Sequence, residues 1–263
     1  MGSNNQSGFT IVEVMLFLAL TGLLFLIGFF GTGTQLRDTR FTDSVRSLHS
    51  FLQKQYSETA AGANGRVNGS QCTADVGNAA SQPTFAATGG ATAGSADNCV
   101  LLGKLVKFNP NSSTVNVYSV VGRRLDMTAL TGTDVTDIAN SRPALSPQTA
   151  ESYTIQWATQ FRQPSTLSAD QQTLAFAFLR SPNSGSIISF AFPMNTITSA
   201  FNPADDDALP SAITTSNLAL TAGYCFEGGN TQTALIRLAP DQQRTNALDV
   251  AFQGINKQTD CVK

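Results

Sequence analysis

Few side chains in this sequence are of a type that could carry chemistry. The chain has one histidine, His49, and four cysteines without a Cys-x-x-Cys pair. A metal site usually brings closely spaced cysteines or companion histidines, and neither occurs here. No Gly-x-Ser-x-Gly elbow, phosphate-binding Walker loop or His-Glu-x-x-His helix is present, so the usual hydrolase, nucleotide and zinc-protease sites are not indicated. The sequence therefore predicts no catalytic residue, no metal and no cofactor.

The cysteines are better explained as disulfides. Their number is even, and all four follow the N-terminal apolar stretch: Cys72, Cys99, Cys225 and Cys261. Three pairings are possible, and we favour Cys72 with Cys99 and Cys225 with Cys261, because each of these bonds closes a local segment. Disulfides require an oxidising compartment, which indicates that this part of the chain lies outside the cytoplasm.

The N-terminal stretch predicts a membrane span. From Phe9 to Gly31 the chain has 23 residues and one charge, Glu13. A helix rising about 1.5 Å per residue crosses the roughly 30 Å hydrocarbon core over that length. A secretory signal peptide would need a basic start and a small-residue cleavage site after the apolar run. Here residues 1–8 contain no Lys or Arg, and the small residue Gly8 comes before the run.

The segment Gly8-Phe9-Thr10-Ile11-Val12-Glu13 resembles the class III leader junction of type IV prepilins and pseudopilins. The resemblance implies cleavage after Gly8, N-methylation of Phe9, and a role for Glu13 in neutralising the terminal amine of a neighbouring subunit during assembly. A lone carboxylate in hydrocarbon costs about 2.5–3.5 kcal/mol on insertion scales, so a partner charge is expected. The alternative is that Glu13 is an interfacial residue at the helix end, solvated by headgroups.

The resemblance also implies partners and a location. The partners are a prepilin peptidase, membrane lipid before assembly, an inner-membrane assembly platform, and other pilin subunits that pack through the N-terminal helix. The location is a single-pass membrane protein with an extracytoplasmic globular domain, which then enters a surface filament. Two features depart from the family pattern: the leader lacks a basic residue, and Phe30 stands where many pilins have a helix-bending proline.

The basic residues that flank the span predict the opposite membrane orientation from the cysteines. Arg37, Arg40 and Arg46 follow the span and nothing basic precedes it, so the positive-inside rule alone would leave the C-terminal part in the cytoplasm. We give the cysteines more weight and expect everything after Gly31 to lie outside.

A helical period continues beyond the span. Apolar residues recur at spacings of four, three, four and four, which marks one buried stripe on a helix: Phe41, Val45, Leu48, Leu52 and Tyr56. We expect one helix over about Phe9–Thr59, its second half packed on a domain, and His49 at the rim of that contact. The predicted divisions are a leader (1–8), the span (9–31), the amphipathic half (32–59), a Gly/Ala/Ser/Thr-rich loop (60–99) and a globular domain (100–263).

The globular part has the pattern of antiparallel strands separated by Pro, Gly and Asn turns. The stretch 123–148 is expected to be a loop with one short helical turn. Strands are predicted at Val100–Phe108, Thr114–Val121, Tyr153–Phe161, Gln172–Leu179, Ser186–Phe192, Leu218–Phe226, Thr233–Leu238 and Asn246–Phe252. The fold class is therefore α+β: a long N-terminal helix packed on an antiparallel sheet or a β-sandwich.

Net charge gives no general reason to expect a nucleic-acid partner. The chain carries a net charge of −2 with 13% charged residues, without the broad basic field that such a partner needs. Four basic residues beside the first predicted hairpin could contact DNA phosphates, although a scattered, solvated surface is the better interpretation: Lys104, Lys107, Arg123 and Arg124.

These patterns together predict a structural subunit of a type IV pilus-like filament, a minor pilin or a pseudopilin, used in adhesion, motility, DNA uptake or secretion. In the order of its elements, the C-terminal half resembles the H-type pseudopilins. Within the family, the alternative is the major subunit. Outside it, the alternatives are a single-pass, membrane-anchored extracellular β-rich binding module and, less favoured, an anchored enzyme.

Overall fold

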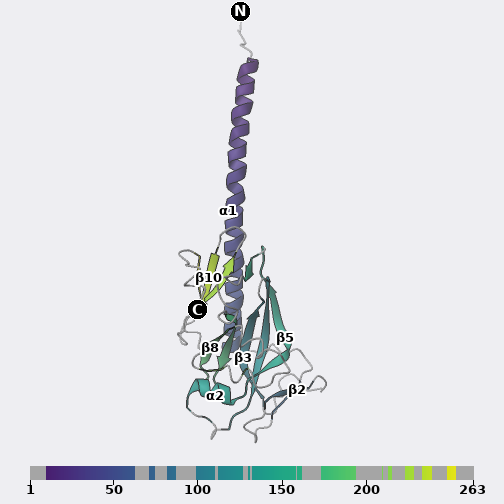
Figure 1. Ribbon diagram of the computed structural model, residues 1–263, viewed down its shortest axis with the longest axis vertical. Coiled ribbons are helices and arrows are strands. Elements are labelled where there is room, and N and C mark those ends of the chain that lie inside the picture. The colour runs from purple at the N-terminus through teal and green to yellow at the C-terminus, as the bar shows by residue number, and fades with distance from the viewer. Residues whose placement is uncertain are drawn as a thin grey trace, which may run out of the picture. The chain divides into compact units, whose positions relative to one another are not determined.

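The computed structural model describes residues 10–62, 71–74, 82–86, 99–109, 112–126, 130, 132–157, 159–161, 173–193, 209, 213–214, 223–227, 233–238 and 248–252. The chain divides into two compact units, Met1–Asp43 and Ser44–Lys263. In the first unit every described residue after Thr10 is helical. The second contains the end of that helix and all the described strands (Figure 1).

The helix α1 runs without a break over Ile11–Ala60, close to the predicted Phe9–Thr59. It ends where Gly62 adopts a φ of +66°, a left-handed conformation that glycine takes without steric cost and that commonly stops a helix. Residue 9 lies outside the described part of the chain.

The largest sheet has five strands in the order β5-β4-β3-β7-β8, and every neighbouring pair is antiparallel. Its strands are β3 (Cys99–Phe108), β4 (Thr114–Arg123), β5 (Ala144–Thr154), β7 (Thr173–Arg180) and β8 (Ile187–Pro193). The predicted hairpin of the first two strands is confirmed, because β3 and β4 pair from Cys99↔Arg123 to Phe108↔Val115.

A second antiparallel sheet has the order β11-β10-β9-β6. It consists of β6 (Gln160–Phe161), β9 (Gly223–Glu227), β10 (Thr233–Leu238) and β11 (Leu248–Ala251). A small two-stranded sheet pairs β1 (Gln71–Thr73) with β2 (Thr84–Ala86). The predicted α+β class with antiparallel sheets is thus confirmed.

Aromatic side chains join the two larger sheets. The ring of Phe108 on β3 lies 5.3 Å from Phe161 on β6 and 5.9 Å from Phe226 on β9, measured between centroids. Phe176 on β7 lies 5.6 Å from the same ring. Phe108, Phe176 and Phe226 are almost fully buried, and such clustered rings contribute beyond the area they bury.

The part of α1 that belongs to the second unit packs on the five-stranded sheet. Val45, Leu48 and Leu52 of the predicted stripe are at most 1% exposed. Phe51 stacks on Tyr153 of β5 with centroids 4.5 Å apart, and Tyr56 meets Phe178 of β7 edge-on at 5.5 Å. These residues of the amphipathic stripe are therefore buried, as their spacing predicts.

Backbone approach is closest at Gly103, in the centre of β3. A Cβ atom there would lie 1.9 Å from the carbonyl oxygen of Phe178 on β7 and 3.0 Å from Cγ2 of Thr59 on α1. The absence of a side chain at this position lets the helix and two strands meet.

Three sequence predictions need correction. The strand expected over Tyr153–Phe161 does not exist: β5 ends at Thr154, the chain turns at Gln156 and Trp157, and β6 begins at Gln160. Ile155 and Phe161, on either side of this turn, are both buried. The sequence pattern of alternating apolar and polar residues therefore does not show where the strand ends.

The second and third corrections concern stretches expected to be loops. In 123–148, the short helical turn is present as α2 (Asp134–Asn140), but residues 144–148 already belong to β5. In 60–99, β1 and β2 pair, and Cys72, Ala74 and Cys99 pack with Val121 in a small apolar cluster. That cluster contains both cysteines of the Cys72–Cys99 disulfide, which brings together residues far apart in the sequence, so composition alone did not reveal it.

Candidate functional site

The N-terminal end of α1 is built as a helix cap. The backbone N–H of Glu13 donates to Oγ1 of Thr10 at 3.4 Å and to its carbonyl oxygen at 3.0 Å, and the N–H of Val14 donates to the same carbonyl at 3.2 Å. Thr followed three residues later by Glu is the composition of a capping box. An acidic group in the first turn also interacts favourably with the helix dipole. The sequence therefore places the carboxylate of Glu13 at the very start of the helix.

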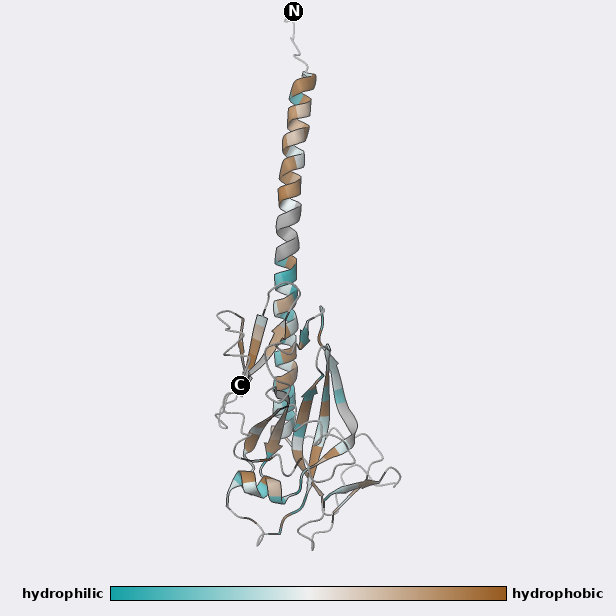
Figure 2. Ribbon diagram, viewed as in Figure 1, coloured by the Kyte–Doolittle hydropathy of each residue, from teal (hydrophilic) through white to brown (hydrophobic). Residues whose placement is uncertain are grey.

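The surface that follows is apolar and uncovered. The window Ile11–Gly28 has a mean hydropathy of 2.5 with none of its 18 residues buried, and it is long and apolar enough to cross a membrane. Ile11, Phe17 and Phe25 are 79%, 67% and 77% exposed. In Figure 2 the ribbon of this part of α1 is coloured as hydrophobic over most of its length. An apolar patch of this extent marks a site of contact with membrane or protein.

The one hydroxyl in this window is satisfied within the helix. Oγ1 of Thr21 donates to the carbonyl oxygens of Phe17 and Leu18 at 2.8 and 3.1 Å. In hydrocarbon an unpaired hydroxyl is costly, and bonding back to the preceding turn removes that cost. Gly22 and Gly28 have open space where a Cβ would be. The window thus carries Glu13 as its single charge and offers no other polar group that requires water.

The remaining predicted site residues are placed as follows. Gly8 and Phe9 lie outside the described residues. The predicted bond between Cys72 and Cys99 is present, with Cα atoms 6.2 Å apart and both residues buried. Cys225 lies in β9 and is disulfide-bonded, while its predicted partner Cys261 lies outside the described residues, so the second pairing stays a prediction.

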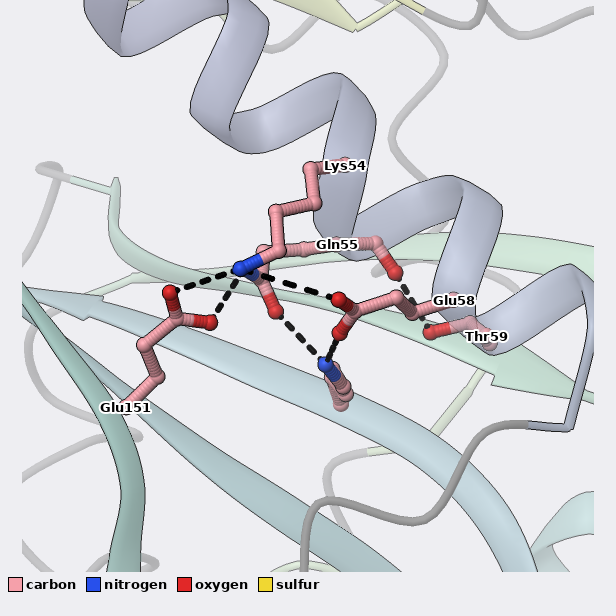
Figure 3. A network of polar contacts seen from close by, with 6 residues as sticks. Lys54, Gln55, Glu58, Thr59 and Glu151 are labelled. Atoms are coloured by element: carbon pink, nitrogen blue, oxygen red, sulfur yellow. Dashed lines mark hydrogen bonds and ion pairs between the residues drawn. The ribbon is translucent and has the colours of Figure 1, made fainter.

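A buried polar network, which the sequence analysis missed, fixes the end of α1 to the sheet. Lys104 on β3 is only 3% exposed. Its ammonium group donates to Oε1 of Gln55 at 2.8 Å and also contacts the carboxylate of Glu58. Gln55, itself fully buried, donates from Nε2 to Oε2 of Glu151 on β5 at 2.9 Å. Figure 3 shows these helix residues beside Glu151, with Glu151 facing Lys54 and Gln55.

Lys54 closes the network on its solvent side. Its Nζ lies 2.9 Å from Oε1 of Glu151 and 3.7 Å from Oε1 of Glu58. The hydrogen bond to Glu151 raises the pKa of Lys54 above its ordinary value. Partial burial would raise the pKa of Glu151, but the hydrogen bonds from Lys54 and Gln55 outweigh it, and that pKa lies below its ordinary value.

The directions of these two pKa shifts determine the pH range over which the network stabilises the fold. The contribution of Glu151 is present above the ordinary carboxyl pKa and is lost as pH falls through the lowered value. That of Lys54 is present below the ordinary amine pKa and is lost as pH rises through the raised value. The network therefore supports folding across the neutral range.

One signal in the sequence could have revealed the network. Gln55 and Thr59 continue the helical spacing of the buried Leu48 and Leu52, and Oγ1 of Thr59 donates to the carbonyl of Gln55 at 2.9 Å. A polar residue at a buried stripe position needs a polar partner. The identity of that partner, Lys104, depends on how the sheet packs.

The basic residues considered for DNA contact do not form a surface patch. Lys104 and Arg123 are 3% and 6% exposed, and Nε of Arg123 donates to the carbonyl of Asn140 at 3.0 Å. The expectation of a solvated surface was therefore also wrong for these two residues. His49 is half-buried, and its Nε2 lies 3.2 Å from the carbonyl oxygen of Leu248 on β11, which agrees with the predicted rim position.

Comparison with known proteins identifies the N-terminal segment. Residues 3–29 match the family model of the prokaryotic N-terminal methylation motif, which covers the predicted leader junction and the apolar window. A search of curated proteins and a search of solved structures each returned no match. The motif is that of the class III signal of type IV pilins, and it is joined here to an apolar helix. The N-terminal segment of this chain is thus similar to that of type IV pilins.

Proposed function

We propose that this protein is a structural subunit of a type IV pilus-like filament, a minor pilin or pseudopilin, that assembles through α1. The observation that carries the proposal is the apolar window Ile11–Gly28, none of which is buried, within a segment that matches the methylation motif. Before assembly the bilayer covers this surface, and in a filament the helices of other subunits replace the lipid. The role is structural and not enzymatic.

Processing at Gly8 and pairing at Glu13 belong to the same proposal. Cleavage after Gly8 by a prepilin peptidase creates a new terminal amine at Phe9, which is then methylated. The capped start of α1 holds Glu13 as the only charge in the apolar window. Pairing its carboxylate with the terminal amine of a neighbouring subunit offsets the cost of placing either charge in an apolar surrounding.

The Cys72–Cys99 disulfide supports an extracytoplasmic position for the second unit, since such bonds persist in oxidising compartments. The protein is then inserted once, with its globular unit outside, and passes from the membrane into the filament with the help of an assembly platform in that membrane.

Mass spectrometry of the mature N-terminus tests this function. In cells with an active prepilin peptidase we expect a chain that begins at methylated Phe9. Gly8→Leu blocks cleavage and is the matched control, because it changes neither α1 nor the globular unit. An intact leader on the wild-type chain beside an active peptidase would refute the proposal and favour a single-pass, membrane-anchored binding module.

A further inference from the structure

The C-terminal part of α1 holds a side-chain amide against a buried amine. Nζ of Lys104 donates to Oε1 of Gln55 at 2.8 Å, and the two residues are 3% and 0% exposed. Because Oε1 is bonded to the amide carbon Cδ at about 1.23 Å, Nζ lies within about 4 Å of that carbon. Reacting atoms are close to a productive arrangement at about 3–3.5 Å. A small rotation of either side chain therefore brings the amine against the carbon that it would attack.

The surroundings of this pair keep water away. Across the five-stranded sheet, Lys104 lies directly between Ser119 of β4 and Phe178 of β7, and these neighbours are 2% and 0% exposed. Water is the competing nucleophile for an amide carbon and would also hydrolyse a new amide bond. Its exclusion favours a reaction between the two side chains and protects the product.

Two carboxylates border the pair on different sides. The carboxylate of Glu58 contacts Nζ of Lys104, where a base must stand if the amine is to lose a proton and become a nucleophile. Oε2 of Glu151 accepts a hydrogen bond from Nε2 of Gln55 at 2.9 Å. This bond fixes the amide with its nitrogen toward Glu151 and its oxygen toward Lys104.

Gln55 is a better acyl group for this amine than Glu58. The carboxylate of Glu58 is negatively charged and repels an attacking electron pair, and its side chain is 30% exposed, so that water competes there. The amide of Gln55 is neutral, fully buried and carries a nitrogen that can leave. The arrangement thus contains a nucleophile, a base and an acyl group in contact.

We propose that Lys104 and Gln55 form a covalent side-chain amide bond that joins α1 to β3. Glu58 accepts one proton from the ammonium group, and the freed electron pair of Nζ forms a bond to Cδ of Gln55. The bond from Cδ to Nε2 breaks, and Nε2 takes a second proton from Nζ and leaves as ammonia. Glu58 then gives its proton to the ammonia, which departs as ammonium. Nothing is oxidised or reduced, and no other reactant is needed.

The ion pair of Lys104 with Glu58 is the state before this reaction. The reaction begins only after folding has brought the two residues together, so the freshly folded chain carries the ion pair and the bonded form accumulates from it. The new bond links residues 49 apart in the sequence, so bonded chains should unfold at a higher guanidinium concentration than unbonded ones. All the groups involved belong to the second unit, and the inference does not depend on the proposed function.

Peptide mapping of the full-length chain tests the proposal. Chain purified in detergent is kept at neutral pH, sampled over several days, reduced, digested with trypsin and analysed by tandem mass spectrometry. Unbonded chain gives separate peptides 55–66 and 67–104. In bonded chain trypsin cannot cut after Lys104, so peptide 55–66 stays joined to 67–107, and the product is lighter than its two parts by one ammonia molecule.

We expect the joined peptide to accumulate in the folded chain and to be absent from chain kept in guanidinium from the start. The joined peptide is the readout, because a free peptide that begins with Gln55 can also lose ammonia by cyclising. If the folded wild type gives no joined peptide, the proposal is wrong. A joined peptide that is lighter by one water molecule, with the bond at Glu58, would overturn the assignment to Gln55.

Three variants test the roles of the side chains. Lys104→Arg keeps the positive charge without the amine and should give no joined peptide. Glu58→Gln removes the base and should slow accumulation about a hundredfold or more, with circular dichroism to show that the variant is folded. Lys107→Arg changes the neighbouring lysine of β3 and should leave the rate unchanged. A wild-type rate in folded Glu58→Gln would contradict the role of Glu58 as the base.

Discussion

Replacing Glu58 by glutamine should destabilise the globular unit, because Glu58 is the counter-charge of the buried Lys104. Lys104 is 3% exposed and has Glu58 as its carboxylate partner and Gln55 as its amide partner. Glu58→Gln keeps the shape of the side chain and an oxygen that can accept a hydrogen bond, but removes the negative charge. The ammonium group is then left without its counter-charge.

The expected loss at neutral pH is about 3 kcal/mol. Removing one partner of a buried ion pair costs about 3–5 kcal/mol. The lower end applies because the side chain of Glu58 is itself 30% exposed and the glutamine still accepts a hydrogen bond.

Lys104→Met is the matched control. It removes the charge together with its need for a partner, leaves Glu58 with Lys54 at 3.7 Å, and fills the site with apolar volume. Its main cost is the unpaired Oε1 of Gln55, about 1–2 kcal/mol. Adding Glu58→Gln to Lys104→Met should then cost little more.

Guanidinium unfolding of the full-length chain in detergent at neutral pH, followed by circular dichroism, measures the wild type, the two single variants and the double variant. If Lys104→Met is as destabilising as Glu58→Gln, the reasoning from an unpaired buried charge is wrong.

Three further predictions concern the backbone, the disulfide and the helix start. Gly103→Ala should largely prevent β3–β7 pairing, because its Cβ would overlap the carbonyl of Phe178 at 1.9 Å; a wild-type unfolding midpoint would contradict this. Cys72→Ser with Cys99→Ser should lower the free energy of unfolding by about 3.5 kcal/mol from the loop it opens. Reduction of the wild type should give at least this loss, because it also opens the disulfide of Cys225, and an unchanged free energy of unfolding in the double variant would contradict the prediction. Glu13→Ala should insert into the membrane normally but fail to enter filaments, as fractionation of cells and sheared filaments would show; normal incorporation would argue against charge pairing.

The long helix, the leader junction and most strands follow from local pattern. A 23-residue stretch with one charge has few ways to satisfy its backbone other than a helix in an apolar surrounding. The stripe through Val45, Leu48 and Leu52 similarly requires a partner surface, whichever sheet supplies it. These features are encoded by neighbours in sequence, so they could be predicted without the fold.

The turn at Trp157 illustrates what local pattern misses. Alternation from Tyr153 through Ile155 predicted a continuing strand, but the chain leaves the five-stranded sheet at Thr154 and joins the other sheet at Gln160. Ile155 and Phe161 are nevertheless both buried. Periodicity reports that a residue is buried and does not report which surface buries it. The strand boundary is therefore decided by how the two sheets meet.

By itself, the sequence determined that the chain carries the methylation motif and an apolar helix, because both depend on residues adjacent in the chain. Only the tertiary structure decided that Lys104 is buried and not on the surface, because its partners Gln55 and Glu58 are brought to it across the helix–sheet contact. A lysine side chain is exposed or buried according to what surrounds it in space, and the spacing of residues in the sequence does not contain that information.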